Sequence, residues 1–120
     1  MLYNESQEMY LETILKIQEK KGSVHAIDIA AELNYSKPSV SRAVDILQKE
    51  GYITVTSDRT ICLTACGREK AENIFARHET LTAAFVKMGL DPAEAEDNAC
   101  KIEHVISETA FEKLKAYFQL

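Results

Sequence analysis

The stretch that decides the fold is AIDIAAELNYSKPSVSRAVDILQKEGYITVTSDRTICL, residues 26–63. Apolar residues recur at helical spacing over 26–33 and again over about 37–50, with a three-residue turn between the two runs. Ser36 is the expected N-cap of the second helix, and Gly51 is expected to end it. Two short helices at this spacing predict a helix-turn-helix.

The hydrophobic period then changes from 3.6 to 2. Apolar residues alternate with polar ones over 53–55 and 61–63, and Ser57-Asp58-Arg59 between them is typical of a turn. A two-stranded hairpin is therefore predicted directly after the second helix. A hairpin in this position makes the motif a winged helix-turn-helix.

The predicted second helix begins with residues suited to the major groove of DNA. Small hydroxyl side chains allow close approach, lysine and arginine reach guanine edges or phosphates, and the proline ring can touch a thymine methyl group. An arginine at the hairpin tip is expected to hold the backbone and fix the register. The candidate DNA-binding residues are Lys37, Pro38, Ser39, Ser41, Arg42 and Arg59. A winged helix used only for protein contacts is the alternative.

The rest of the chain is predicted to be helical. Helices are expected near residues 4–20, from about 65 to Gly89, over 92–105, and from Ser107 to about Phe118. The fold class is mainly α, with a winged helix-turn-helix domain over residues 1–70 and a helical domain over 71–120. In the second domain Phe85, Val86, Phe111, Leu114 and Phe118 exceed what a small domain can bury, so we expect a homodimer interface there.

Composition narrows the classes of protein further. The net charge is −5, but residues 1–70 hold 9 basic and 10 acidic residues and residues 71–120 hold 5 and 9, so the acidity lies mainly in the second half. No membrane-length apolar run or secretory signal is visible, and three cysteines are an odd number. We therefore expect reduced thiols and a cytoplasmic location without membrane contact. No catalytic triad or phosphate-loop pattern appears, so an enzyme is not expected.

A second set of residues has the chemistry of metal ligands. Cys100, Glu103 and His104 are spaced i, i+3 and i+4, which places a thiolate, a carboxylate and an imidazole on one helix face. This mixed set suits a first-row divalent ion. Met9 and Glu12 share a face of the first predicted helix. From the residues alone, a structural role for each of these side chains, and for His78, stays open.

Several motifs occur in a fixed order along the chain. They are Glu8-Met9-Tyr10-Leu11, Ser57-Asp58-Arg59, Thr64 to Gly67-Arg68, Arg77-His78, Gly89-Leu90-Asp91 and Cys100-x-x-Glu103-His104. With this ordered set the chain closely resembles the diphtheria toxin repressor family of metal-dependent transcriptional regulators. The resemblance runs from about residue 4 to the C-terminus and implies the short, two-domain form with a winged helix and a metal-binding and dimerisation domain.

The resemblance also implies which residues bind metal. The iron-type primary site uses a methionine with the cysteine, glutamate and histidine of the last motif, which match Met9, Cys100, Glu103 and His104. Its ancillary site uses a histidine matching His78, but its further glutamate and histidine fall at Thr82 and Glu96. The manganese type has an aspartate in place of Met9, a glutamate matching Glu12 and a glutamate in place of Cys100. The metal-ligand candidates are therefore a hybrid set: Met9, Glu12, His78, Cys100, Glu103 and His104.

The expected function is a metal-activated repressor that binds double-stranded operator DNA as a homodimer and controls metal homeostasis. Sulfur ligands favour Fe²⁺ over Mn²⁺, and Mn²⁺ is the second candidate. Zn²⁺, Co²⁺ or Ni²⁺ is expected to bind as a surrogate for the natural ion. Because the ligand candidates lie in both predicted domains, metal is expected to set the angle between them. The alternative is a winged-helix regulator that responds to thiol oxidation at Cys100 or to an organic ligand.

Overall fold

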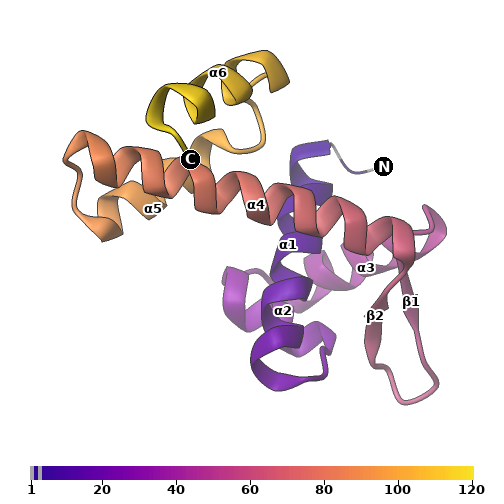
Figure 1. Ribbon diagram of the computed structural model, residues 1–120. Coiled ribbons are helices and arrows are strands. Elements are labelled where there is room, and N and C mark those ends of the chain that lie inside the picture. The colour runs from indigo at the N-terminus through magenta and orange to yellow at the C-terminus, as the bar shows by residue number, and fades with distance from the viewer. Residues whose placement is uncertain (1, 3) are drawn as a thin grey trace. The chain divides into compact units, whose positions relative to one another are not determined.

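The computed structural model describes residue 2 and residues 4–120, which form two compact units, Met1–Glu72 and Asn73–Leu120 (Figure 1). The division lies two residues after the boundary expected from the sequence. Six helices and one hairpin make up the described part of the chain. The prediction of a mainly helical fold with a winged helix-turn-helix is confirmed.

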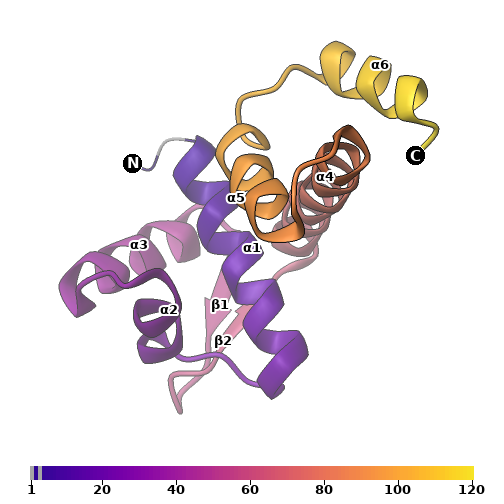
Figure 2. The same ribbon diagram turned by 90° about the vertical axis from the view of Figure 1, so that its left-hand side faces the viewer.

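The first unit is built on three helices. They are α1 (Asn4–Lys21), α2 (Ala26–Leu33) and α3 (Lys37–Lys49), and α2 packs against both of the others. Figure 2 shows α2 and α3 side by side. One-sided apolar patterning drives this packing, because the residues buried completely between the helices include Leu11, Ile14, Ile29, Val40 and Leu47.

Local caps set the bounds of the helix-turn-helix. The Ser36 hydroxyl accepts the Ser39 N–H at 3.3 Å, and Pro38 lies in the first turn of α3, where its missing N–H costs nothing. Gly51 follows α3 with a φ of +85°, a conformation that other residues adopt only at a cost. The turn and the start of α3 therefore lie where the sequence predicts them.

The hairpin of β1 (Ile53–Val55) and β2 (Ile61–Leu63) forms the wing, which projects beyond the helices of its unit (Figure 1). The strands are antiparallel, with Ile53 opposite Leu63 and Val55 opposite Ile61. The Ile61 N–H also donates to the Val24 carbonyl at 2.8 Å. The wing is thus tied to the segment that leads into α2.

The second unit contains most of α4 (Ala65–Met88), together with α5 (Pro92–Ile102) and α6 (Glu108–Phe118). Its core joins these helices through buried Leu81, Ala99 and Phe111, against which Phe85 and Leu114 pack. Three of the five apolar residues that the sequence analysis assigned to a dimer interface therefore belong to the unit's own core. Val86, from the predicted set, is exposed, and the other exposed large apolar residues of this unit are Met88, Val105, Tyr117 and Leu120.

One predicted helix is too long. The expected helix over 92–105 ends at Ile102, and the Val105 N–H turns back to the Ile102 carbonyl in a tighter, i→i+3 bond. Ser107 caps α6, so the chain must change direction between the two helices within a few residues. Among the described residues, no helix is long and apolar enough to cross a membrane.

Candidate metal centre and nucleic-acid interface

The start of α3 presents the predicted DNA-binding side chains to solvent. Lys37, Pro38, Ser41 and Arg42 are exposed, and Ser39 is half-buried. The Arg42 guanidinium donates to the Ser39 hydroxyl at 3.5 Å, and that hydroxyl is also bonded to Ser36 at 2.9 Å. The Ser39 hydroxyl thus links the Arg42 side chain to the N-cap residue of α3.

The wing brings a second arginine to the same place. Arg42 and Arg59 both line a hollow of about 260 Å³ between α3 and the hairpin, together with Ser41, Val55 and Asp45. Two cations and a hydroxyl at the rim of one groove are suited to phosphate and base contacts. The structure thus brings together residues that are 17 positions apart in the sequence.

The conformation of the wing tip is held by its own polar groups. Arg59 has a φ of +70°, and its N–H donates to the Thr56 carbonyl at 2.9 Å. The Asp58 carboxylate accepts from the Thr56 hydroxyl, and the Thr60 N–H donates to that hydroxyl at 3.1 Å. Hydrogen bonds from Thr56 and then Thr60 lower the pKa of Asp58. The tip is therefore a preformed turn that displays Arg59.

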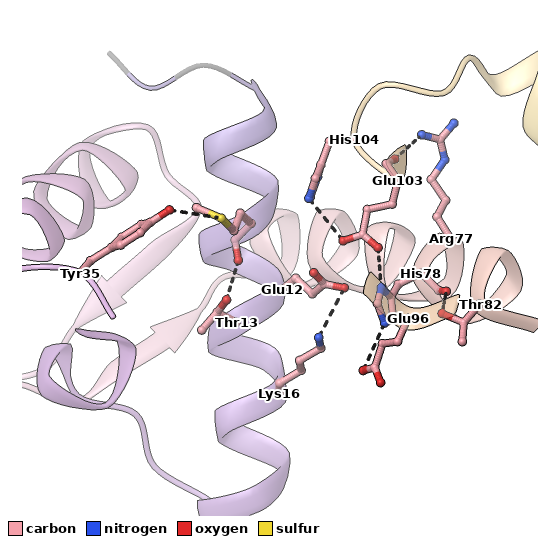
Figure 3. Close-up of polar contacts among 11 residues, drawn as sticks. Glu12, Thr13, Lys16, Tyr35, Arg77, His78, Thr82, Glu96, Glu103 and His104 are labelled. Carbon is pink, nitrogen blue, oxygen red and sulfur yellow. Dashed lines mark hydrogen bonds and ion pairs between the residues drawn. The ribbon is translucent and has the colours of Figure 1, made fainter. Parts of the chain in front are cut away.

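In the second unit, a buried carboxylate lies between two imidazoles. Glu103 is fully buried, with Oε2 2.6 Å from His78 Nδ1 and Oε1 3.3 Å from His104 Nε2 (Figure 3). Arg77 donates to the Glu103 carbonyl at 2.9 Å and so holds this residue at the end of α5. A buried carboxylate requires compensating positive charge, which protonated histidines or a cation can supply.

His78 has a second acidic neighbour that the sequence analysis did not assign. A carboxylate can only accept, so a neutral His78 that donates from Nδ1 to Glu103 presents a lone pair at Nε2. That Nε2 lies 3.6 Å from Oε1 of Glu96. A proton on Nε2 or a cation between the two atoms satisfies both acceptors, so this arrangement is compatible with a bound metal as well as with a protonated His78. The spacing of seven residues between Glu96 and Glu103 indicated a shared helix face.

Cys100 does not share this buried environment. Cys100 lies on α5 and is exposed, whereas Glu103 and His104 come after the last residue of that helix. Glu103 is the C-cap of α5 and keeps the helical backbone conformation, with its N–H donating to the Ala99 carbonyl at 3.0 Å, so its helical spacing from Cys100 holds. His104 lies in the turn that follows. Within the second unit, the structure brings together His78, Glu103 and His104, with Glu96 beside them.

The remaining ligand candidates lie on α1 in the first unit. The Tyr35 hydroxyl donates to the Met9 sulfur at 3.7 Å, and the Thr13 hydroxyl donates to the Met9 carbonyl at 2.8 Å. Glu12 is 4.0 Å from the ammonium of Lys16, one turn later (Figure 3). Thioether and carboxylate are both donors that first-row ions accept. Sequence reasoning missed the contact of Tyr35 with Met9.

Two family models together match almost the whole chain. The iron dependent repressor N-terminal DNA binding domain matches residues 2–61, and the iron dependent repressor metal binding and dimerisation domain matches residues 64–119. A relative of similar length is an uncharacterized HTH-type transcriptional regulator from Methanocaldococcus jannaschii. It is 33% identical over 118 residues, which are 97% of this chain and 94% of that protein.

Other relatives are longer proteins. The diphtheria toxin repressor of Corynebacterium diphtheriae is 32% identical over 92% of this chain and 49% of its own length. The iron-dependent repressor IdeR of Mycobacterium tuberculosis is 33% identical over 92% of this chain and 48% of its own length. The chain thus spans about half the length of these two repressors.

Solved structures share the fold. The metal-dependent transcriptional regulator MtsR superposes with a TM-score of 0.86 at 21% identity, over 98% of this chain and 55% of that one. A manganese-dependent transcriptional repressor in complex with manganese also gives 0.86, at 24% identity, over 94% of this chain and 52% of that one.

Proposed function

We propose that this chain, which belongs to the iron-dependent repressor family, is a metal-responsive transcriptional repressor that binds double-stranded operator DNA. The membership confirms the resemblance predicted from the sequence. It also favours a regulator over an enzyme. The alternative of a regulator driven by thiol oxidation or an organic ligand is not favoured by these relatives.

The proposal that the protein responds to metal rests on one observation. Glu103 is fully buried, and its carboxylate contacts the imidazoles of His78 and His104. Removing an ionised carboxylate from water costs several kcal/mol unless positive charge compensates it. Two imidazoles and a further carboxylate, that of Glu96, around this group are donor types that first-row divalent ions accept. We interpret the cluster as part of a cation-binding site.

The proposed ligands follow from donor chemistry and from the family. They are Met9, Glu12, His78, Cys100, Glu103 and His104, and Glu96 is added because of its place beside His78. When bound, the ion supplies the positive charge that these oxygen, nitrogen and sulfur donors share. We propose Fe²⁺ as the favoured ion because a thioether and a thiolate are soft ligands, with Mn²⁺ as the second candidate. The relatives named above include iron-dependent and manganese-dependent proteins.

The proposal that the protein binds DNA rests on residues of the first unit. Lys37, Pro38, Ser39, Ser41 and Arg42 would enter the major groove, and Arg59 would hold the flanking backbone. A symmetric operator requires a two-fold dimer, which we assign to the second unit. We further propose a cytoplasmic location, where such a regulator meets chromosomal DNA, and a role in metal homeostasis.

The test is metal analysis of anaerobically purified protein, combined with DNA binding at a fixed salt concentration, with and without chelator. We expect stoichiometric metal and DNA affinity that falls when chelator is added. Glu103→Gln should lose metal, whereas Glu112→Gln, an exposed glutamate on α6, should retain it. Thermal unfolding of both metal-free variants checks that they fold. DNA affinity that is equally high in chelator would contradict the proposal.

A further inference from the structure

Tyr35 is an exposed residue that is held from three sides. It lies in the turn between α2 and α3, and its side chain is 42% exposed. Its N–H donates to the Ala30 carbonyl at 3.1 Å, and the preceding Asn34 adopts the left-handed conformation that ends α2. Its backbone is therefore fixed by the helix-turn-helix itself.

The ring of Tyr35 is fixed by an aromatic neighbour on α1. The rings of Tyr35 and Tyr10 have centroids 6.1 Å apart and an interplanar angle of 65°, an edge-to-face contact within the favoured range. Tyr10 is 5% exposed and so belongs to the core of the unit. Such a pair is favourable, so the contact favours this orientation of the Tyr35 ring.

The hydroxyl of Tyr35 then points at the sulfur of Met9 (Figure 3). The oxygen and sulfur are 3.7 Å apart, and the thioether can only accept. Methionine has three rotatable side-chain bonds, so a fixed donor restricts where its sulfur lies. A thioether sulfur has two lone pairs, and one stays available when the other accepts a hydrogen bond.

We infer that Tyr35 is a positioning residue that orients the Met9 thioether for metal binding and links that ligand to the turn before α3. The inference rests on the proposed function, because it takes Met9 as a metal ligand. Groups that hold a ligand through a hydrogen bond typically contribute about 10–100-fold to metal affinity when the ligand is a histidine or carboxylate. A hydroxyl–thioether bond is weaker, so we expect roughly 3–10-fold here.

The first experiment uses the metal-free protein. The chain has three methionines, so a sample labelled with ¹³C at the methionine methyl groups gives few signals, and Met9→Leu identifies the one from Met9. Tyr35→Phe keeps the ring and removes the hydroxyl. We expect the Met9 methyl signal to shift in Tyr35→Phe and to stay unchanged in Tyr52→Phe, a matched change in the same unit. An unshifted Met9 signal in Tyr35→Phe would overturn the inference.

The second experiment measures Zn²⁺ affinity as a redox-stable probe, in a double-mutant cycle. Tyr35→Phe should weaken Zn²⁺ binding roughly 3–10-fold in the parent chain. In a Met9→Leu background it should have less than a twofold effect, because its target is gone. A merely structural role would give the same loss in both backgrounds, which would overturn the inference, as would an unchanged affinity in the parent chain.

A third measurement distinguishes this role from direct DNA contact. At saturating Zn²⁺, operator affinity of Tyr35→Phe should equal that of the parent chain, because every site is filled. A loss of DNA affinity at saturation, with Zn²⁺ affinity unchanged, would assign Tyr35 to the DNA interface instead. Failure of the parent chain to bind Zn²⁺ at all would contradict the proposed function and, with it, this inference. A parent chain that binds Zn²⁺ while Tyr35→Phe binds it equally well contradicts the inference alone.

Discussion

Gly67 lies where α4 passes closest to the backbone of Tyr52. A Cβ atom at this position would be 2.0 Å from the Tyr52 carbonyl oxygen, and the Gly67 N–H donates to the Thr64 hydroxyl at 3.1 Å. Alanine is favoured over glycine by about 1 kcal/mol inside a helix, but a clash with backbone cannot relax by a side-chain rotation. The steric effect should therefore exceed the helix preference.

We predict that Gly67→Ala lowers the free energy of unfolding by about 1–3 kcal/mol, the usual cost of overpacking. Urea unfolding of the metal-free protein measures this change. The neighbouring Cys66→Ala is the control, because Cys66 is exposed and should change stability by less than about 0.5 kcal/mol. A Gly67→Ala protein as stable as its parent would show that α4 and Tyr52 can move apart at little cost.

The two arginines that line the hollow beside α3 should differ in their effect on DNA binding. Arg42 is on α3 and Arg59 is at the wing tip. We propose that Arg42 reads bases and that Arg59 holds phosphates. We predict that Arg42→Ala loses about 1–3 kcal/mol on the operator and relaxes base preference. Arg59→Ala should weaken binding to all DNA sequences alike and should reduce by about 1 the slope of log binding constant against log salt concentration. Titrations at several salt concentrations measure both effects, and unchanged binding in both variants would exclude this docking.

At the scale of the element, Asp28 stabilises the start of α2. Its Oδ2 accepts the His25 N–H at 2.9 Å in a capping box, and its Oδ1 accepts from the Lys21 ammonium at 2.6 Å. The hydrogen bond from Lys21, followed by that from the His25 backbone, lowers the pKa of Asp28 below its usual value of 3.8. A lowered pKa means that the charged form is favoured in the folded state.

The sign of the pH dependence follows from that direction. The stabilisation by Asp28 is present above pH 3.8 and is lost as the pH falls through the lower, folded-state pKa. We predict that Asp28→Asn lowers unfolding free energy by about 1 kcal/mol at pH 7, the typical value of a cap. The difference from the parent should close as the pH falls below that folded-state pKa.

Chemical unfolding at a series of pH values tests this prediction. Asp45→Asn is the matched control, because its ion pair with Lys49 is exposed on both sides and should contribute less than about 0.5 kcal/mol. A difference between Asp28→Asn and its parent that stays constant down to pH 2 would show that the charge of Asp28 is not the cause.

At the scale of the whole molecule, the second unit leaves large apolar side chains in contact with solvent. Tyr117 is 82% exposed and Val105 is 66% exposed. We predict that the metal-loaded chain sediments as a dimer at micromolar concentration and that Tyr117→Glu weakens the dimer about tenfold or more, because aromatic residues dominate interface energies. Ile27→Glu, which alters an apolar residue of the first unit that is 61% exposed, should leave the dimer intact. A monomer in the parent chain would contradict the assembly.

Metal and DNA should each strengthen the binding of the other. Reciprocity requires that operator DNA raise metal affinity by the same factor by which metal raises DNA affinity, commonly 5–150-fold, or about 1–3 kcal/mol. Metal affinity should also rise with pH, because imidazole and thiol ligands release protons on binding. Competition with a chelator, with and without operator at constant salt, measures both trends. Equal metal affinity with and without DNA would exclude coupling between metal binding and DNA binding. It would not contradict the metal site or the DNA-binding surface taken separately.

The sequence by itself determined the order and type of the elements. Ser36 lies at the N-cap that the sequence predicts, Ser107 caps the helix that was expected to begin there, and Gly51 follows the helix that it was expected to end. These features are local: a cap or a turn depends on hydrogen bonds and backbone angles within about four residues. The alternation that predicted the wing is local in the same sense.

Only the tertiary structure decided which side chains meet. The contact of His78 with Glu103 spans 25 residues and that of Tyr35 with Met9 spans 26. Glu103, the C-cap of α5, is buried, whereas Cys100, three residues earlier, is exposed, although their spacing alone predicts neighbouring positions on one helix face. Helical periodicity states where a side chain points on its own helix. Which partner it reaches depends on how the helices pack and on where each one ends, and both are set by contacts between distant parts of the chain.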